Sequence, residues 1–392
     1  MAIAFCCLIA FLDGADTQAL AIAAPGIAHQ FAIGPGALGL IFSANLLGAT
    51  IGATTCGALA DRIGARRMLV ACTIAFGVFQ FFTSMAHDYT SLMLMRFAAG
   101  LGLGGAAPCF LALAAANTEP ERRTARIGLI WACFPLGGFV GGFINGWLIQ
   151  NLGWPTMFMV GGIAPVMVGL LLALLVADPP REDEKASTPR SAGVLRTLAG
   201  DAALRYRAVL LAGIYFAAFG TLAAVTVWVP SMMVARGFSM MSGGQILSWH
   251  ALGALVSMAF AGVLVERFGP LILFGGLLLS AAALAILGMS IGSFAAAALM
   301  MVVLGILLGL VASGGIALAQ QIFPSNVRVG GFGLTMASGR AGQMVLPAVV
   351  GGLLSLRLTA DIVLGLVALI PLLGSLAAAA LGRTLRAEKR RE

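Results

Sequence analysis

Residues 57–64 of the chain read GALADRIG, and residues 262–269 read GVLVERFG. The two stretches share a glycine, an acidic residue, an arginine and a second glycine at the same spacing. They lie 205 positions apart, which is about half of the 392 residues. Each stretch follows a long apolar segment. A repeat at this offset indicates two halves built on the same plan.

Outward from this repeat, apolar residues dominate the sequence. The chain is 60% hydrophobic and only 10% charged, whereas a soluble domain carries about a quarter charged residues. Apolar runs of about 20 residues, the length that crosses a hydrocarbon core of about 30 Å, recur from end to end. Because lipid leaves bare backbone groups unsatisfied, and because the runs are continuous, we expect membrane-spanning helices and not barrel strands.

The sequence therefore predicts an all-α polytopic membrane protein with about twelve transmembrane helices in two pseudo-symmetric six-helix bundles. A polar segment divides the halves, so we expect an N-terminal bundle at 1–177, a cytoplasmic linker at 178–203, and a C-terminal bundle with a short cytoplasmic tail at 204–392. We expect a monomer, because each half supplies the other with a partner. The predicted spans are 2–28, 37–60, 67–86, 90–115, 125–150, 154–177, 205–235, 241–265, 271–292, 294–320, 329–356 and 360–383.

Basic residues set the orientation of these spans. With a cytoplasmic N-terminus, 19 of the 23 lysines and arginines fall in inner loops or in the C-terminal tail. Because such residues favour the cytoplasmic side, we expect a multi-pass protein of the bacterial inner membrane with both termini in the cytoplasm. The net charge of +8 is spread over these loops, so we expect no nucleic-acid partner. The apolar N-terminus lacks a basic leader, unlike a secretory signal peptide.

Five charged or histidine side chains lie inside the predicted spans and away from their ends: Asp13, Asp16, Arg96, His250 and Arg340. An Asp or Arg at this depth costs roughly 2.5–3.5 kcal/mol to insert, which makes function the default interpretation. Asp13 and Asp16 share one helix face, about 4.5 Å apart along the axis. Because a low dielectric and mutual repulsion favour one protonated carboxyl, we predict that this pair binds a coupling proton. The alternative is that both carboxylates brace neighbouring helices.

The two intramembrane arginines are candidate binding residues for a carboxylate, because a guanidinium stays charged and grips a carboxylate with two hydrogen bonds. We expect Arg96 to pair with Asp16 inside the N-terminal half, which leaves Arg340 in the C-terminal half for a substrate. The alternative for Arg340 is a fixed ion pair between helices.

His250 and three aromatic residues are further substrate-binding candidates. His250 could donate to a hydroxyl or carboxylate or relay a proton, although a lone histidine often only packs. Trp131, Tyr215 and Trp228 could wall an aromatic-sized cavity, and the alternative is that each anchors at the membrane interface or packs in the core. Weaker candidates are Asn45, Gln80, Gln245 and Gln343.

The first copy of the repeat resembles the loop signature of the major facilitator superfamily, and the resemblance covers nearly the whole chain. The matching positions are Gly57, Asp61, Arg62, Gly64, Arg66 and Arg67. Ala65 stands where a basic residue is usual. The resemblance implies that these residues, with Glu266 and Arg267 in the second copy, gate the cytoplasmic helix ends through ion pairs and helix dipoles. The alternative is that the charges only set topology.

Three other stretches are similar to the aromatic acid:proton symporter family within that superfamily. Residues 13–16 read DGAD, with Ala15 in place of the usual aromatic, and residues 96–108 and 339–342 resemble the family's fourth and eleventh helices. The resemblance implies proton-coupled import of a small aromatic carboxylic acid, of hydroxybenzoate or phenylpropionate type, by alternating access. The expected partners are a small organic anion, protons and the lipid bilayer.

Two other functions stay open. A proton symporter for a non-aromatic organic acid or a sugar acid is one, because Arg340 would serve any carboxylate. A non-transporting membrane sensor is the other, although such proteins usually append a large soluble domain. We find no activated nucleophile and no metal-ligand cluster, and the six cysteines lack paired spacing, so we expect no enzyme activity, no metal and no cofactor. Residues 135–142 lack the Gly-Pro pair of drug antiporters, which disfavours efflux.

Overall fold

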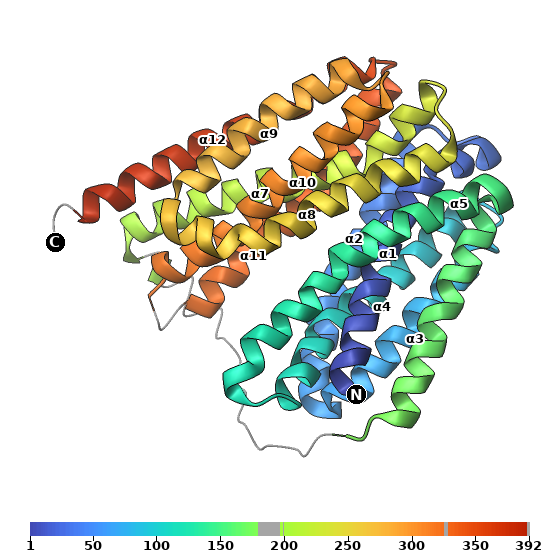
Figure 1. Ribbon diagram of the computed structural model, residues 1–392, viewed down its shortest axis with the longest axis horizontal. Coiled ribbons are helices and arrows are strands. Elements are labelled where there is room, and N and C mark those ends of the chain that lie inside the picture. The colour runs from blue at the N-terminus through green and yellow to red at the C-terminus, as the bar shows by residue number, and fades with distance from the viewer. Residues whose placement is uncertain (179–196, 199, 325–327, 390–392) are drawn as a thin grey trace. The chain divides into compact units, whose positions relative to one another are not determined.

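The computed structural model describes residues 1–178, 197–198, 200–324 and 328–389. The side chains of Glu266, of residues 328–329 and of residues 387–389 lie outside that description. Most of the predicted linker at 178–203 also lies outside the described residues, so the linker stays a prediction. The regular elements among the described residues are all helices (Figure 1).

The helices follow the predicted apolar runs. Ten of them, counted over the described residues, are long and apolar enough to cross a membrane, which confirms the all-α polytopic fold; α11 is not among these ten, and the count of twelve spans stays a prediction. The elements are α1 (Ala2–Phe31), α2 (Pro35–Ile63), α3 (Ala65–Thr83), α4 (Tyr89–Ala116), α5 (Pro120–Leu175), α7 (Ala202–Ala235), α8 (Met240–Phe268), α9 (Leu271–Ser290), α10 (Phe294–Ile322), α11 (Arg328–Ser355) and α12 (Ala360–Lys389).

The 56-residue α5 contains two arms joined at one glycine. Gly153 has non-helical angles, φ 82° and ψ 166°, a backbone region that glycine enters at little steric cost. This turn falls between the predicted fifth and sixth spans, where Figure 1 shows α5 folding back on itself. The next residue, Trp154, donates from its indole to Gln30 Oε1 at 2.8 Å and packs against Phe31 and Phe158.

By contacts, the chain forms two compact units. Unit 1 comprises the described residues of Met1–Ala186 and Thr226–Ala251, and unit 2 comprises those of Ser187–Val225 and Leu252–Glu392. These units do not test the predicted bundle boundaries, which remain predictions.

Unit 1 is held by backbone-to-backbone approaches at small residues, as expected where lipid gives no hydrophobic drive between helices. A Cβ added to Gly14 of α1 would lie 1.8 Å from the Phe134 carbonyl oxygen of α5. A Cβ on Gly104 of α4 would lie 1.9 Å from the Ala49 oxygen of α2. The second arm of α5 approaches α3 in the same way, since a Cβ on Gly162 would lie 2.6 Å from the Gly77 oxygen.

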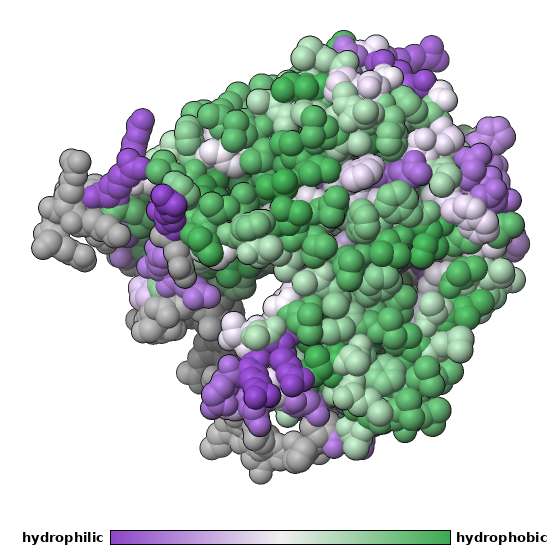
Figure 2. All heavy atoms as spheres, in the orientation of Figure 1, coloured by the Kyte–Doolittle hydropathy of each residue, from purple (hydrophilic) through white to green (hydrophobic). Residues whose placement is uncertain are grey.

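Unit 2 packs α9 against α12 and against α10. Its core includes Tyr215, Leu277, Val311 and Leu381, all at most 1% exposed. The outward faces of α9 and α12 carry leucines that are largely exposed, such as Leu279, Leu373 and Leu376. Figure 2 shows that the face formed by these helices is hydrophobic along its length and hydrophilic near the C-terminal end of α12. Such a face suits contact with lipid.

Both copies of the repeat end at a glycine with a positive φ angle. Gly64 and Gly269 have positive φ angles of 105° and 52°, in the region that favours glycine. In each copy the glycine N–H donates to the carbonyl four residues earlier, on Ala60 and Val265, at 2.8 Å. The two copies thus share a glycine with positive φ and one hydrogen bond, while the next helix begins directly after Gly64 but one residue later after Gly269.

Candidate functional site

Four polar side chains from four helices meet inside unit 1: Asp16 of α1, Asn45 of α2, Gln80 of α3 and Arg96 of α4. We call them the Asp16–Arg96 network. Gln80 donates from Nε2 to Asp16 Oδ1 and accepts at Oε1 from Arg96 Nη1. Arg96 Nη2 lies 3.5 Å from Asp16 Oδ2 and 3.1 Å from Asn45 Oδ1. The ion pair expected between Arg96 and Asp16 is present.

The network is almost completely shielded. The exposed fractions are 1% for Arg96 and 6% for Asp16, and the Arg96 guanidinium lies 5.3 Å from the centre of the Phe158 ring. A buried pair offsets its desolvation only through good geometry and further hydrogen bonds, which Gln80 and Asn45 supply here. Loss of the charge on Asp16 would therefore leave the buried Arg96 guanidinium without its carboxylate.

Asp13 lies one turn away from Asp16 in different surroundings. It is half-buried, and the Thr17 hydroxyl donates to its Oδ1 at 3.3 Å and to its carbonyl oxygen at 2.9 Å. The two carboxylates predicted to share a proton thus differ in access, with Asp16 held in the network and Asp13 nearer the surface of α1.

Ala15, the departure from the expected signature, lies against α5. A Cβ on Gly141 would come within 2.6 Å of both Cα and Cβ of Ala15, and Asn145 donates to the Ala15 carbonyl oxygen at 3.0 Å. The small side chain at position 15 is explained by this close approach of two helices.

The other substrate-binding candidates in unit 1 differ in burial and in their contacts. His250 is 5% exposed, and its Nε2 has no hydrogen-bond partner among the described residues. Trp228 is buried against Phe42, with ring centres 5.9 Å apart. Trp131 is partly exposed and packs its edge on Phe110. His250 therefore offers a free polar atom, whereas both tryptophans offer apolar surface.

Arg340 and Tyr215 belong to unit 2. Arg340 is half-buried, with Nη1 3.5 Å from Gln343 Oε1 one turn further along α11. The Tyr215 hydroxyl donates to the Ala312 carbonyl oxygen at 3.1 Å, and its ring stacks on Phe219. A Cβ on Gly339 would lie 3.0 Å from the Phe219 ring and 3.5 Å from that of Tyr215. The helix that carries Arg340 thus packs directly on these two aromatic rings.

Two arginines of the signature at residues 57–67 make an ion-pair cluster that we did not expect. Arg66 Nη1 lies 3.0 Å from Asp178 Oδ1, and Arg67 Nη2 lies 2.8 Å from Asp178 Oδ2. Hydrogen bonds from Arg66, and then from Arg67, hold the pKa of Asp178 below its usual range. The start of α3 is thereby tied to the end of the second arm of α5. The only sequence signal for Asp178 is that it is the first acidic residue after the sixth predicted span.

The remaining gating candidates are more exposed or fall outside the description. Asp61 and Arg62 are exposed at the end of α2. A Cβ on Gly57 would lie 3.6 Å from the Pro108 side chain of α4, which is ordinary van der Waals contact. The Arg267 guanidinium lies 5.4 Å from the Phe268 ring centre, while the Glu266 side chain is not among the described groups.

Known proteins similar to this chain are membrane transporters. The family model described as Major Facilitator Superfamily matches residues 6–347. The 3-(3-hydroxy-phenyl)propionate transporter of Escherichia coli (strain K12) is 33% identical over 365 residues, covering 91% of this chain and 87% of the relative. The 4-hydroxybenzoate transporter of Pseudomonas putida is 27% identical over 370 residues, covering 87% and 83%.

Solved structures agree on the fold. The inward-facing and occupied crystal structure of a bacterial homologue of the human lysosomal transporter Spinster superposes with a TM-score of 0.77. It covers 97% of this chain and 96% of the other at 16% identity. At that identity the likeness concerns the fold alone.

Proposed function

Because this chain belongs to the Major Facilitator Superfamily, we propose that it imports a small aromatic carboxylate together with a proton by alternating access. The observation that carries the proposal is the relation to two transporters named for hydroxylated aromatic acids, each of which matches more than four-fifths of the chain. The chain functions as a monomer in the bacterial inner membrane, with both termini in the cytoplasm.

The coupling proton binds at Asp13 and Asp16. Asp13 is the more accessible carboxylate and receives the proton first, and Asp16 is the one whose protonation has a structural effect. When Asp16 is neutral, its attraction for Arg96 disappears, and the guanidinium is free to turn to another anion. The geometry of the network supports this proposal, because Arg96 is the only cation that contacts Asp16 within the described part of the chain.

The substrate carboxylate binds Arg340, and Arg96 is a second candidate for contact with the substrate once Asp16 has gained a proton. Arg340 suits this role because it is half-buried, lies on the helix that packs against Tyr215 and Phe219, and keeps its charge at any working pH. His250 donates to a ring hydroxyl of the substrate, and Trp131, Tyr215 and Trp228 supply apolar walls.

The cytoplasmic gate is formed by the signature residues, Glu266 and Arg267 in the second copy, and Asp178. The contacts of Arg66 and Arg67 with Asp178 hold the helix ends of unit 1 together while the rest of the gate opens and closes.

The test is uptake into proteoliposomes that contain the purified protein. We expect saturable uptake of labelled 3-(3-hydroxyphenyl)propionate or 4-hydroxybenzoate that an inward proton gradient drives and an uncoupler abolishes. Asp16→Asn should abolish accumulation, and Asp13→Asn should weaken it. Arg340→Lys should raise the half-saturation concentration, because an ammonium lacks the bidentate grip. Gradient-driven uptake that survives in both Asp variants refutes the proton site.

A non-aromatic organic acid or sugar acid is the second candidate substrate, because Arg340 would hold any carboxylate and Ala15 replaces an aromatic residue. Uptake of only aliphatic acids in the same panel would select it. A membrane sensor that does not transport would bind an acid without moving any acid of the panel, and that result refutes both transport proposals.

A further inference from the structure

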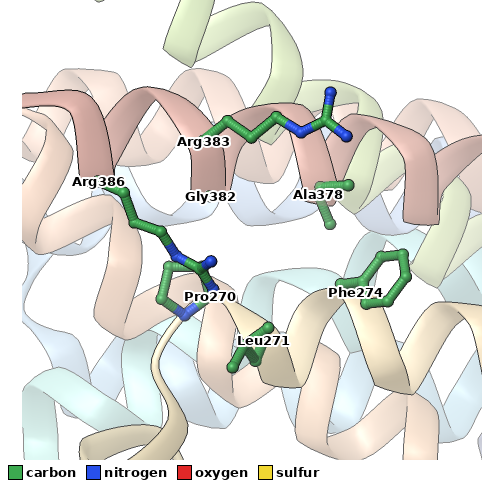
Figure 3. Close-up of a pocket in the computed structure, with 8 residues that line it drawn as sticks. Pro270, Leu271, Phe274, Ala378, Gly382, Arg383 and Arg386 are labelled. Atoms are coloured by element: carbon green, nitrogen blue, oxygen red, sulfur yellow. The ribbon is translucent and has the colours of Figure 1, made fainter.

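A groove separate from the network lies in unit 2 between the start of α9 and the end of α12 (Figure 3). Its volume is about 170 Å³, and its walls include Pro270, Leu271 and Phe274 from one side and Ala378, Arg383 and Arg386 from the other. Figure 3 shows Arg386 extending from α12 toward Pro270, while Phe274 lies across from Ala378. The Arg383 side chain runs along α12 toward Ala378, so the groove is lined by two cationic side chains and by apolar ones.

The two arginines of the groove have no ion-pair partner in the part of the chain that the structure describes. Arg383 and Arg386 are both exposed. The opposing end of α9, at Leu271, has no side-chain cap and no acidic residue in its first turn, so its positive helix end adds to the potential that favours an anion. Two guanidinium groups at a helix end are suited to a phosphate.

The internal repeat allows the residues of this groove to be compared with those at the equivalent positions of unit 1. At the offset of 205 positions, Arg66 corresponds to Leu271 and Asp178 corresponds to Arg383. In unit 1 the arginine and the carboxylate close the gap between two helix ends at 3.0 Å. In unit 2 the same two positions hold an apolar residue and a cation. At these two positions unit 2 therefore has one cation, Arg383, and no carboxylate to complete an ion pair.

The apolar side chains of the groove continue into a row of exposed leucines. Leu271 is 50% exposed, and beyond the groove Leu279, Leu373 and Leu376 are exposed by 56–65% along the same two helices. In Figure 2 this face changes from hydrophobic to hydrophilic toward the end of α12. A ligand that fits both the cationic and the apolar side chains carries a phosphate next to a hydrocarbon chain.

We propose that this groove binds an anionic phospholipid of the cytoplasmic leaflet. Its phosphate contacts Arg383 and Arg386, and one acyl chain follows Leu271 and Phe274. Basic groups between helices at the cytoplasmic edge of a membrane are suited to anionic headgroups. The lipid supplies to unit 2 the anion that Asp178 supplies to unit 1, and so ties the start of α9 to the end of α12. This inference does not depend on which solute the chain carries.

The test measures lipid retained by the delipidated, detergent-purified protein by native mass spectrometry. Phosphatidylglycerol and phosphatidylcholine with identical chains are titrated separately. We expect one phosphatidylglycerol site that Arg383→Ala/Arg386→Ala weakens by about tenfold or more, because charge-assisted hydrogen bonds to the phosphate are lost. The matched control, Arg122→Ala/Arg123→Ala, removes two exposed charges from the start of α5 and should leave that site unchanged. Equal weakening in both double variants overturns the proposal.

Two further arms make the assignment specific. Leu271→Arg/Arg383→Asp reproduces in unit 2 the arrangement of unit 1, so this variant should keep its helix content and its monodisperse peak while losing the phosphatidylglycerol site. Full lipid retention by this well-folded variant contradicts the proposed contacts. Inorganic phosphate at the same concentration should not compete, because it lacks the acyl chain, and effective competition would identify a soluble-anion site instead.

Discussion

Removing one charge from the buried Asp16–Arg96 pair is expected to destabilise the protein more than removing both. The nearest charged atoms are 3.5 Å apart, so at an effective dielectric constant of about 20 their attraction is about 5 kcal/mol. Asp16→Asn or Arg96→Gln alone leaves an unpaired buried charge, and each should lower the free energy of unfolding by about 3–5 kcal/mol. In Asp16→Asn/Arg96→Gln no charge remains, and the new amides can still bond to Gln80 and Asn45.

The double variant should therefore lose less than either single variant, which makes the coupling energy at least as large as one single loss, about 3–5 kcal/mol. Unfolding in mixed detergent and dodecyl sulfate micelles, followed by far-ultraviolet circular dichroism, measures all four states. Asp13→Asn is the control, because Asp13 is half-buried and lies outside the network, and its loss should be smaller. Additive losses in the double variant would refute the interpretation of the network as a mutually dependent pair.

Three other predictions concern single contacts. Asp178→Asn should lower the free energy of unfolding at neutral pH, where the Asp178 carboxylate is charged. Because the pKa of Asp178 is lowered in the folded protein, the difference in free energy of unfolding from wild type should fade as the pH drops through that lowered value. A constant difference across an acid titration would contradict this prediction. Gly14→Ala should strongly reduce the yield of monodisperse protein, since its Cβ would meet the Phe134 oxygen at 1.8 Å, whereas Gly128→Ala, with nothing within 4 Å, should not; size-exclusion chromatography compares them. Tyr215→Phe should cost about 1 kcal/mol through the lost bond to Ala312 and leave the half-saturation concentration for uptake unchanged; a shifted half-saturation concentration would mean that the hydroxyl contacts substrate.

The fold was largely predictable because its signal is local. Apolar runs set the spans, and even the closely spaced ninth and tenth predicted spans are separated in the structure, where α9 ends at Ser290 and α10 begins at Phe294. The single-residue turn at Gly153 was less predictable. The glycine before Trp154-Pro155 indicates a boundary between two spans. It does not indicate that the two helices are joined by one residue with no loop.

The site residues were predictable where charged side chains are rare, inside the membrane spans. So few charges lie at membrane depth that Asp16 and Arg96, 80 positions apart, were expected to meet, and they do. Gln80 was only a weak candidate, because an amide inside a span is common enough to carry little information. Asp178 was missed because its contact with Arg66 joins residues 112 positions apart at an exposed edge, where many charges occur and no spacing links them.

The turn at Gly153 has a mechanical consequence. A single residue lies between the arm of α5 that packs on α1 and the arm that packs on α3, and Trp154 fastens the bend to the end of α1 through Gln30 and Phe31. A displacement of the end of α1 would therefore act on both arms at the point where they join.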